Sequence, residues 1–213
     1  MIGRYGGRLD LIPSHLGLID VDLDLAAHVG GSRFHVGTAG YLWAHRLLAD
    51  ALDDRAFREY DLVLLDCAPN FNMVTRTAVV ASDHILIPAK ADYLSTLGID
   101  YLRRKLAELV RDYNQAAGGE EINPAILGIV FNMIQFVGEV PIIAARNYVT
   151  RTGLYEVPVF RQMIRESKTL FATAGERGLP AVLLAQSHPT VLSELRQLAT
   201  EFLARFPAVK ERT

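Results

Sequence analysis

Apolar residues alternate along the chain between short uninterrupted runs and longer stretches in which they recur every three or four positions. Short runs are typical of strands covered on both faces of a parallel sheet, and the longer periodicity is typical of helices lying on such a sheet. The alternation therefore predicts an α/β fold with a mostly parallel sheet flanked by helices. The expected strands are Leu9–Pro13, Tyr60–Asp66, His84–Ala89 and Ala125–Asn132, with a further edge strand at Tyr155–Phe160.

Helices are expected between and after these strands. The stretch Thr38–Phe57, for example, places Leu42, His45 and Leu48 at steps of three and four, as a helix with one buried face requires. A chain of 213 residues suits one domain with a sizeable core. The expected helices are Asp20–His28, Thr38–Phe57, about Asn72–Ala81, Leu97–Asn114, about Val140–Thr152, Lys168–Glu176 and Thr190–Phe206.

The strand expected at Tyr60–Asp66 is the most informative stretch, because four consecutive aliphatic residues, Leu62–Leu65, lead directly to an acid. Ligands of open parallel sheets bind just outside the carboxyl ends of the strands. Asp66 is therefore expected where a nucleotide-bound metal or an attacking water would lie. The other interpretation is a turn or helix-capping aspartate. Cys67 follows, and without a nearby histidine we expect it to be a small buried residue of no chemical role.

Composition and charge exclude several function classes. The formal net charge of -2 gives no overall attraction to DNA or anionic lipid, so any contact with nucleic acid requires a local basic patch. The single cysteine excludes an internal disulfide and a multi-cysteine zinc site, and the six histidines lack metal-ligand spacing. No signal-like segment and no run of about 20 apolar residues occurs. A cytoplasmic protein without a membrane span is therefore expected.

Several segments, met in order, share the pattern of one known family. They read LDLIPSHLGL from Leu9, YDLVLLDCAPNFN from Tyr60, SDHILIPAKADYLSTLGI from Ser82, AILGIVFNMI from Ala125 and AGERGLPAVLL from Ala174. These segments resemble the ParA/MinD family of deviant Walker A P-loop ATPases, and most closely its chromosome and plasmid partition branch. The resemblance covers about residues 9–206. It implies that residues 1–213 form one ParA-like nucleotide-hydrolase domain with a P-loop NTPase-like fold, although an incomplete one.

The resemblance also implies ATP and Mg²⁺ as cofactors, with a defined set of site residues. Asp66 would contact the magnesium shell through water, or the attacking water. Asn132 would read the adenine edge with its paired donor and acceptor. Pro88, Asp92 and Tyr93 would shape the loop beside the nucleotide and the face used for dimerisation. For all of these residues an ordinary turn or loop role is the alternative.

The resemblance also implies a set of residues that contact DNA. Partition ATPases carry non-specific DNA contacts in the corresponding region, and phosphate contact requires only clustered positive charge. A solvated helix face is the alternative, because Glu139, Glu156 and Glu166 dilute the patch. The basic residues concerned are Arg146, Arg151, Arg161, Arg165 and Lys168.

The family's phosphate loop, rich in glycine and carrying two lysines, is expected before Leu9, and the sequence contains no such loop. Backbone amides of that loop cradle the phosphates, and its lysine neutralises their charge. Neither Gly6-Gly7 nor Gly30-Gly31 is followed by Lys-Ser or Lys-Thr. We therefore expect no hydrolysis of ATP by this chain alone. Loss of the loop's strand would also leave unpaired edges beside Leu62–Leu65, to be covered by a partner, a second chain or a rearranged sheet.

Function is expected to follow the family: a homodimer that forms with ATP, binds DNA without sequence preference and responds to a ParB-like partner, with nucleoid association left open. A catalytically inactive binding or scaffold module is one alternative. A MinD-like spatial regulator or a protein named after cobyrinic acid a,c-diamide synthase is another. A MinD-like regulator would favour a long basic amphipathic helix at the C-terminus. A cobyrinic acid a,c-diamide synthase would need a further domain with its own catalytic cysteine.

Overall fold

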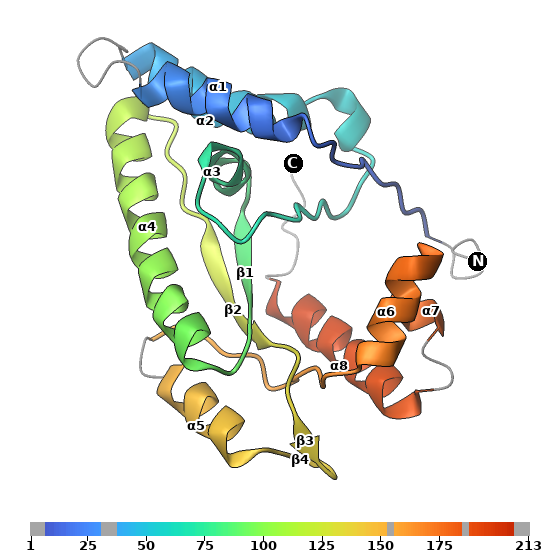
Figure 1. Ribbon diagram of the computed structural model, residues 1–213. Coiled ribbons are helices and arrows are strands. Elements are labelled where there is room, and N and C mark those ends of the chain that lie inside the picture. The colour runs from blue at the N-terminus through green and yellow to red at the C-terminus, as the bar shows by residue number, and fades with distance from the viewer. Residues whose placement is uncertain (1–6, 31–37, 153–155, 185–187, 207–213) are drawn as a thin grey trace. The chain divides into compact units, whose positions relative to one another are not determined.

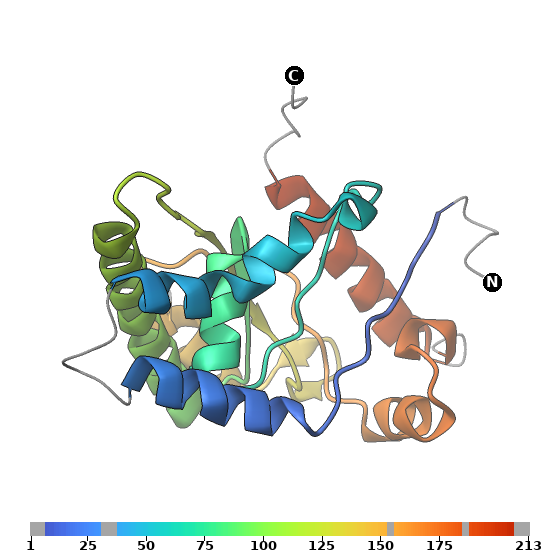
Figure 2. The same cartoon turned by 90° about the horizontal axis from the view of Figure 1, so that it is seen from above.

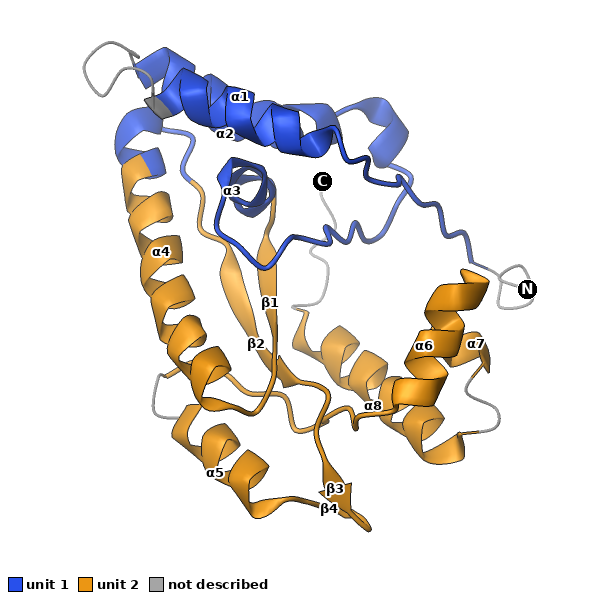
Figure 3. Ribbon diagram, viewed as in Figure 1, with its two compact units in different colours: residues 1–81, 113–121 blue, residues 82–112, 122–213 orange. Residues whose placement is uncertain are grey.

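A computed structural model describes residues 7–30, 38–152, 156–184 and 188–206, which form two compact units (Figure 1, Figure 3). The first unit contains residues 1–81 and 113–121, and the second contains residues 82–112 and 122–213. The elements, in order, are α1 (Leu18–Gly30), α2 (Thr38–Leu52), η2 (Arg55–Phe57), α3 (Met73–Val80), β1 (His84–Ala89), α4 (Tyr93–Ala117), β2 (Ala125–Phe131), β3 (Phe136–Val137), β4 (Val140–Pro141), α5 (Ile143–Thr152), α6 (Lys168–Arg177), α7 (Ala181–Leu184) and α8 (Pro189–Arg205).

The first unit is built on three helices, α1, α2 and α3. Their shared core is small and centres on Leu25, Ala44 and Met73, one residue from each helix. The start of α3 is capped twice, because the Asn72 side chain accepts from the backbone N–H of Thr75 at 3.0 Å and an α1 carboxylate accepts from that of Val74 at 3.0 Å. That carboxylate belongs to Asp22. Caps of this kind satisfy amides that a helix cannot bond internally, so they fix α1 against the beginning of α3.

The second unit is built on β1 and β2, which pair in parallel with a register irregularity between Ile85 and Leu86. Ile87, Ile129 and Phe131 from these strands are buried together with Ile99 of α4. The short antiparallel hairpin β3–β4 follows β2. A separate small cluster joins α6, α7 and α8. The parallel pairing and the helical cover give the α/β class that the sequence pattern predicts.

The outer edge of β2 is partly covered by the segment that follows α5. Ile129 donates its backbone N–H to Pro158 O at 2.8 Å, and Phe160 returns a bond to Ile129 O at 2.9 Å. The edge strand expected at Tyr155–Phe160 is thus a single parallel bridge at Val159, and Tyr155 itself lies outside the described residues. Among the described residues, the sheet therefore consists of two full strands, and isolated parallel bridges follow at Ile129–Val159 and Ile134–Arg165.

Two expected strands are wrong. Neither Leu9–Pro13 nor Tyr60–Asp66 forms a strand, and both are extended segments whose aliphatic side chains are mostly exposed. Aliphatic runs favour strands, but a strand also needs a paired neighbour, and no backbone hydrogen bond among the described residues joins either segment to another strand; the bond from Tyr60 N–H to Phe57 O is a local turn. Cys67 is likewise exposed instead of buried. The helix expected from Val140 begins at Ile143, because the hairpin takes up the first residues of that stretch.

Candidate nucleotide site

The acid that the sequence singles out, Asp66, belongs to the first unit. It lies near the end of the extended stretch 61–67, is exposed, and has no ion pair with any described residue. The next residue, Cys67, is exposed as a whole, but partial burial of its sulfur and the neighbouring Asp66 charge raise the pKa of its thiol. Because the thiolate is the reactive form, this shift disfavours nucleophilic chemistry at Cys67. Asp61 and Asp66 are both exposed carboxylates of this stretch, and Asp66, at its end, is the one that the sequence pattern assigns to a hydrated cation.

The second unit brings together the carboxyl ends of β1 and β2. Asn132 follows β2 directly, and its backbone N–H donates to Ala89 O, at the end of β1, at 2.9 Å. Pro88 is exposed within β1 and pairs in register with Val130. Asn132 and the loop after β1 therefore share one edge of the sheet, which is where parallel sheets bind ligands.

Asp92 has a clear structural role at the start of α4. Its carboxylate accepts from the backbone N–H of Ser95 at 2.8 Å, and its carbonyl oxygen accepts from the Thr96 hydroxyl at 2.8 Å. This is a helix cap, the ordinary alternative that the sequence left open. The same cap fixes the first residue of α4, Tyr93, whose side chain is exposed. Asp92 thus fixes the backbone at Tyr93.

The backbone after β2 adopts an uncommon conformation. Met133 has a φ of 53°, in the left-handed region that residues other than glycine rarely occupy, and its side chain is exposed. The chain turns here, directly after Asn132, before Ile134 bonds to Ile164. Such strain is often found beside binding sites, because the surrounding structure holds a side chain in a set direction. The residue fixed by this turn is Asn132.

A metal ion and a nucleotide require different chemical groups from these residues. Among the described residues, no group of three or more histidine, cysteine, aspartate or glutamate side chains is arranged to hold a metal ion. Mg²⁺ in nucleotide sites usually keeps several waters and uses one or two carboxylates together with phosphate oxygens, which a single acid such as Asp66 fits. The carboxamide of Asn132 likewise fits a base edge. The lysine and glycine loop that grips phosphates is not among the residues of the sequence.

The five basic residues expected to contact DNA lie in the second unit and differ in their surroundings. Arg146 and Arg151 are exposed on α5, and Arg161 is exposed in the loop that follows the bridge at Val159. Arg165 bonds to Glu194 of α8 at 2.6 Å and to Glu139 at 3.3 Å, and its guanidinium lies over the Phe136 ring. These carboxylates raise the pKa of Arg165 and already neutralise its charge. Lys168 is exposed, 3.6 Å from Glu166.

A further arginine, Arg205 at the end of α8, was missed by the sequence reasoning. Its guanidinium donates to Leu127 O and to Val159 O, both at 2.8 Å, and to the Glu201 carboxylate at 2.7 Å. It also lies 3.7 Å from the centroid of the Phe160 ring. No signal in the sequence links a residue near 205 to β2. Arg205 thus closes the edge of β2 that the bridge at Val159 leaves open.

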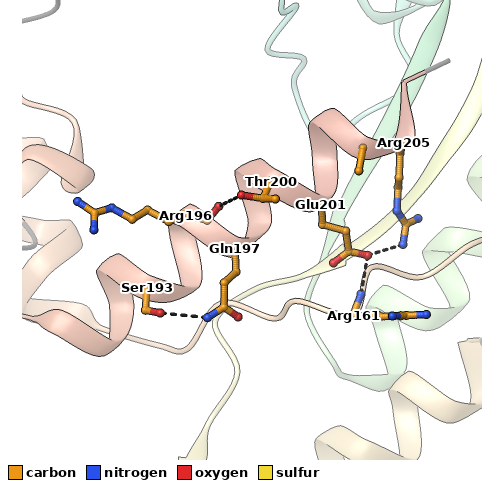
Figure 4. A pocket seen from close by; sticks show the side chains of 8 residues that line it. Arg161, Ser193, Arg196, Gln197, Thr200, Glu201 and Arg205 are labelled. Atoms are coloured by element: carbon orange, nitrogen blue, oxygen red, sulfur yellow. Dashed lines mark hydrogen bonds and ion pairs between the residues drawn. The ribbon is translucent and has the colours of Figure 1, made fainter. Parts of the chain in front are cut away.

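Glu201, one turn before Arg205, is part of the same network. Burial alone would raise its pKa, but the backbone N–H groups of Arg161 and Gln162, both at 3.0 Å, and the Arg205 guanidinium hold the pKa of Glu201 below its ordinary value. Figure 4 shows this carboxylate between Arg161 and Arg205. The adjoining hollow of about 600 Å³ runs along one face of α8. It is lined by Arg161, Ser193, Arg196, Gln197, Thr200, Glu201, Ala204 and Arg205.

Comparison with known proteins places the chain in a family. The family model described as AAA domain (AAA_31) matches residues 4–117, more than half of the 213 residues. Similar curated proteins include the cell division protein PomZ of Myxococcus xanthus, 31% identical over 107 residues, and the chromosome partitioning protein ParA of Caulobacter vibrioides, 29% identical over 126 residues. The chain belongs to the ParA/MinD family of P-loop ATPases. This confirms the family that the sequence motifs indicate.

These ParA/MinD-family relatives are longer than the matched region. The match covers 50% of this chain and 29% of PomZ, and 59% of this chain and 40% of ParA. The chain thus spans less than half of the length of these two curated relatives.

Solved structures support the family fold. Apo McdA from Cyanothece has a TM-score of 0.66 at 20% identity, with 90% of this chain and 67% of that chain covered. A McdA–ATP complex has a TM-score of 0.62 at 16% identity, covering 96% of this chain and 81% of that chain. The cell division ATPase MinD of Pyrococcus furiosus has a TM-score of 0.52 at 21% identity, covering 75% and 58%. Within the described residues, no helix is long and apolar enough to cross a membrane.

Proposed function

We propose that this chain is a ParA-like ATPase, or the portion of one without the Walker A segment, that acts in DNA partition or cargo positioning. The observation that carries the proposal is the family match over residues 4–117, together with the likeness to a chromosome partitioning ParA over 126 residues. ATP-dependent dimerisation, non-specific DNA binding, a ParB-like partner and a cytoplasmic location are parts of the same proposal.

In this proposal the chain supplies one part of a nucleotide site. ATP with Mg²⁺ provides the phosphoryl group and the cation that balances its charge, and the protein contributes mostly position and electrostatics. Asp66 orients the magnesium shell or the attacking water through its exposed carboxylate. Asn132, held by its backbone bond to Ala89 and by the turn at Met133, recognises the base. Pro88, Asp92 and Tyr93 shape the loop beside it.

Nucleotide binding tests this assignment most directly. We expect the chain alone to bind a fluorescent ATP analogue weakly and to turn ATP over slowly or not at all, because the lysine that grips the phosphates is not among its residues. Asn132→Ala should weaken the binding, whereas the matched change Asn147→Ala, on the exposed surface of α5, should not. Asp66→Asn should reduce the effect of Mg²⁺ on affinity, and Asp61→Asn in the same exposed stretch should leave it unchanged.

Three results would count against this assignment. Rapid Mg²⁺-dependent turnover by the chain alone contradicts the expectation of an incomplete site. Affinity that is equal in wild type and Asn132→Ala removes the base-reading role of Asn132. No measurable nucleotide affinity, in a chain that is well folded by circular dichroism, favours the catalytically inactive scaffold.

The proposed DNA contact rests on exposed positive charge in the second unit. Arg146, Arg151, Arg161 and Lys168 are exposed and available to phosphates, and we add Arg196, which is exposed beside the hollow on α8. Arg165 belongs to the proposed patch by sequence, but its two carboxylate partners make it the weakest contributor. Contacts of this type add affinity without reading sequence.

A salt titration separates phosphate contact from a solvated surface. Loss of one phosphate contact lowers the slope of log affinity against log salt by about 1, so Arg161→Ala and Arg196→Ala should each have this effect on a duplex of arbitrary sequence. Arg111→Ala is the control, because that exposed arginine is paired with Asp112 on α4. Identical slopes for wild type and both patch variants would remove DNA binding from this face.

A further inference from the structure

In the second unit, α8 lies alongside the segment that leads from α5 to α6 (Figure 1, Figure 2), and two adjoining hollows lie against both. The larger, of about 600 Å³, is shown in Figure 4 and reaches Ala204 near the end of α8. The smaller, of about 320 Å³, reaches Thr190 at the start of α8 and Phe136 of the β3–β4 hairpin. We call the two hollows together the α8 groove, because three residues line both: Arg161, Ser193 and Gln197.

The α8 groove has the length of a short extended peptide. Its lining residues on α8 run from Thr190 to Ala204, a rise of about 21 Å along the helix axis. An extended chain covers this distance in about six residues. A volume of a few hundred Å³ also suits a small ligand or a short peptide, whereas a DNA duplex could reach only the side chains at the rim. The dimensions therefore favour a peptide as the occupant.

The carboxylates of the α8 groove are already paired. Glu201 accepts two backbone N–H groups at 3.0 Å and lies 2.7 Å from the Arg205 guanidinium. Glu194 is 7% exposed and accepts from the guanidinium of Arg165 at 2.6 Å and from its backbone N–H at 2.9 Å. Glu139, at the hairpin end, lies 3.3 Å from the same guanidinium. The three acids of the groove are therefore neutralised from within the chain.

Two cations of the groove, in contrast, have no carboxylate partner among the described residues. Arg161 and Arg196 are exposed, and their guanidinium groups form no ion pair within that part of the chain. Guanidinium groups bind carboxylates through two parallel hydrogen bonds. The unpaired charge of the groove is thus positive and complements acidic side chains. The hairpin end adds apolar surface from Phe136, Pro141 and Met163.

We propose that the α8 groove binds a short extended segment of a partner protein, with acidic side chains that pair with Arg161 and Arg196 and an apolar side chain at the hairpin end. This inference goes beyond the proposed function, because binding of the segment requires neither nucleotide nor DNA. Arg161 and Arg196 are also proposed DNA contacts, so the acidic segment and DNA should exclude each other.

A synthetic peptide tests the α8 groove. The probe is fluorescein-labelled GLESESEG, in which the alternate glutamates share one face of an extended chain and the leucine can reach the hairpin end. GLQSQSQG and GLKSKSKG are matched controls of neutral and reversed charge. Fluorescence anisotropy with the full chain should show saturable binding of the acidic peptide, and binding at least about tenfold weaker for both controls. Added salt should weaken the binding.

Two pairs of chain variants separate the groove from exposed charge in general. Arg196→Glu should weaken peptide binding about tenfold or more, whereas Arg111→Glu, at an exposed arginine of α4, should not change it. Ser193→Phe should weaken binding to a similar extent, because the phenyl group would fill the hollow while both arginines remain. Ala199→Phe, at an exposed residue of α8 outside the groove, is its control. Circular dichroism checks that each variant is folded.

The results also separate this inference from the proposed DNA contact. Displacement of the peptide by a duplex supports shared use of Arg161 and Arg196, and peptide binding by a chain without affinity for DNA supports the groove and removes only the DNA contact. Equal affinity for GLESESEG and GLQSQSQG overturns the acidic partner. Unchanged affinity in Ser193→Phe, together with a loss in Arg196→Glu, overturns the groove in favour of exposed charge alone. A folded chain that binds a duplex but not GLESESEG assigns the two arginines to DNA and overturns the proposal.

Discussion

Residues 61–66 of the first unit and β1 of the second have similar aliphatic runs, yet only β1 is a strand. Ile87 in β1 is 5% exposed, whereas Leu64 is 73% exposed. The difference lies in their partners, since β1 pairs along its length with β2 and is covered by Ile99 of α4. The comparison shows that aliphatic composition makes a segment able to form a strand, and that pairing decides whether it does.

The second unit also protects the outer edge of its sheet. Gly128 in β2 allows a close approach, because a Cβ there would lie 2.5 Å from the Arg205 Nη1 atom and 2.7 Å from Pro158 O. The approach lets Arg205 bond the carbonyl oxygen of Leu127, next to the bridge at Val159. The exposed segments of the first unit have no equivalent cover among the described residues. Four changes test this contrast.

The largest effect is expected where the edge of β2 is most crowded. Gly128→Ala should reduce the free energy of unfolding by about 3 kcal/mol, because the new methyl group meets Arg205 and Pro158 and the φ of 146° is strained for any side chain. The measurement is the free energy of opening from amide hydrogen exchange at Ile129 and Val130. Gly138→Ala is the control, since its φ is 63° but nothing lies within 4 Å, and it should lose only about 1 kcal/mol. Equal losses would show that the close approach contributes nothing.

Removal of the arginine itself should have the next largest effect. Arg205→Ala leaves the carbonyl groups of Leu127 and Val159 without the guanidinium donor and removes the ion pair with Glu201, for a loss of about 2 kcal/mol. The same exchange measurement at β2 reports this loss. Arg196→Ala on the exposed side of α8 should change stability by less than about 0.5 kcal/mol. If both substitutions behave alike, the guanidinium does not hold the edge of β2.

The contrast also separates what local sequence could predict from what it could not. The strand His84–Ala89 and the helix at α8 follow from patterns within a few residues, and the structure confirms them. The bond from Arg205 to Leu127 joins residues 78 positions apart, and the cap from Asp22 to Val74 joins residues 52 apart, so no local pattern contains them. Pairing partners are equally distant in sequence. For this reason the strand expected at Tyr60–Asp66 could not be decided from its composition.

The same limit applies to the candidate site. The carboxyl ends of β1 and β2 meet as the parallel pattern predicts, and they bring Asn132 to the loop after Ala89. The capping bond of Asp92 and the left-handed turn at Met133 depend on three-dimensional context. The positive charge of Arg165 is compatible with a DNA contact. Its ion pair with Glu194 joins residues 29 positions apart, so the sequence pattern could not predict it. The roles of these residues in binding nucleotide or DNA stay predictions.

The first unit should be sensitive to acid through His45. This histidine is fully buried, and its Nδ1 lies 2.8 Å from Tyr41 O. Burial lowers the pKa of His45, against the raising effect of the Tyr41 carbonyl and with a further lowering effect of Arg76. The unfolded chain therefore binds the proton more readily than the folded one. The stability contributed by neutral His45 is fully present above the ordinary pKa of about 6.5 and is lost as the pH falls below it.

The urea midpoint of the first unit, followed by fluorescence of the single tryptophan, Trp43, reports this loss. The midpoint of the wild type should decrease between pH 7 and pH 5, and His45→Gln should make it less dependent on pH. His28→Gln is the control, because that exposed ring lies 5.2 Å from the Trp43 ring and should affect fluorescence intensity without changing the midpoint. A wild-type slope that survives in His45→Gln would assign the acid sensitivity to another group.

The smallest effect is expected in the segment that started the comparison. Leu64→Ala should change the free energy of unfolding by less than about 0.5 kcal/mol, because this side chain already lies in water in the folded chain. Ile87→Ala, with a similar loss of aliphatic surface in the buried part of β1, should lose about 3 kcal/mol. Denaturant unfolding gives the free energy of unfolding of both variants, Leu64→Ala and Ile87→Ala. A loss of more than 1 kcal/mol for Leu64→Ala would mean that residues 61–66 are already paired in solution, and the contrast between the two regions would then be one of degree.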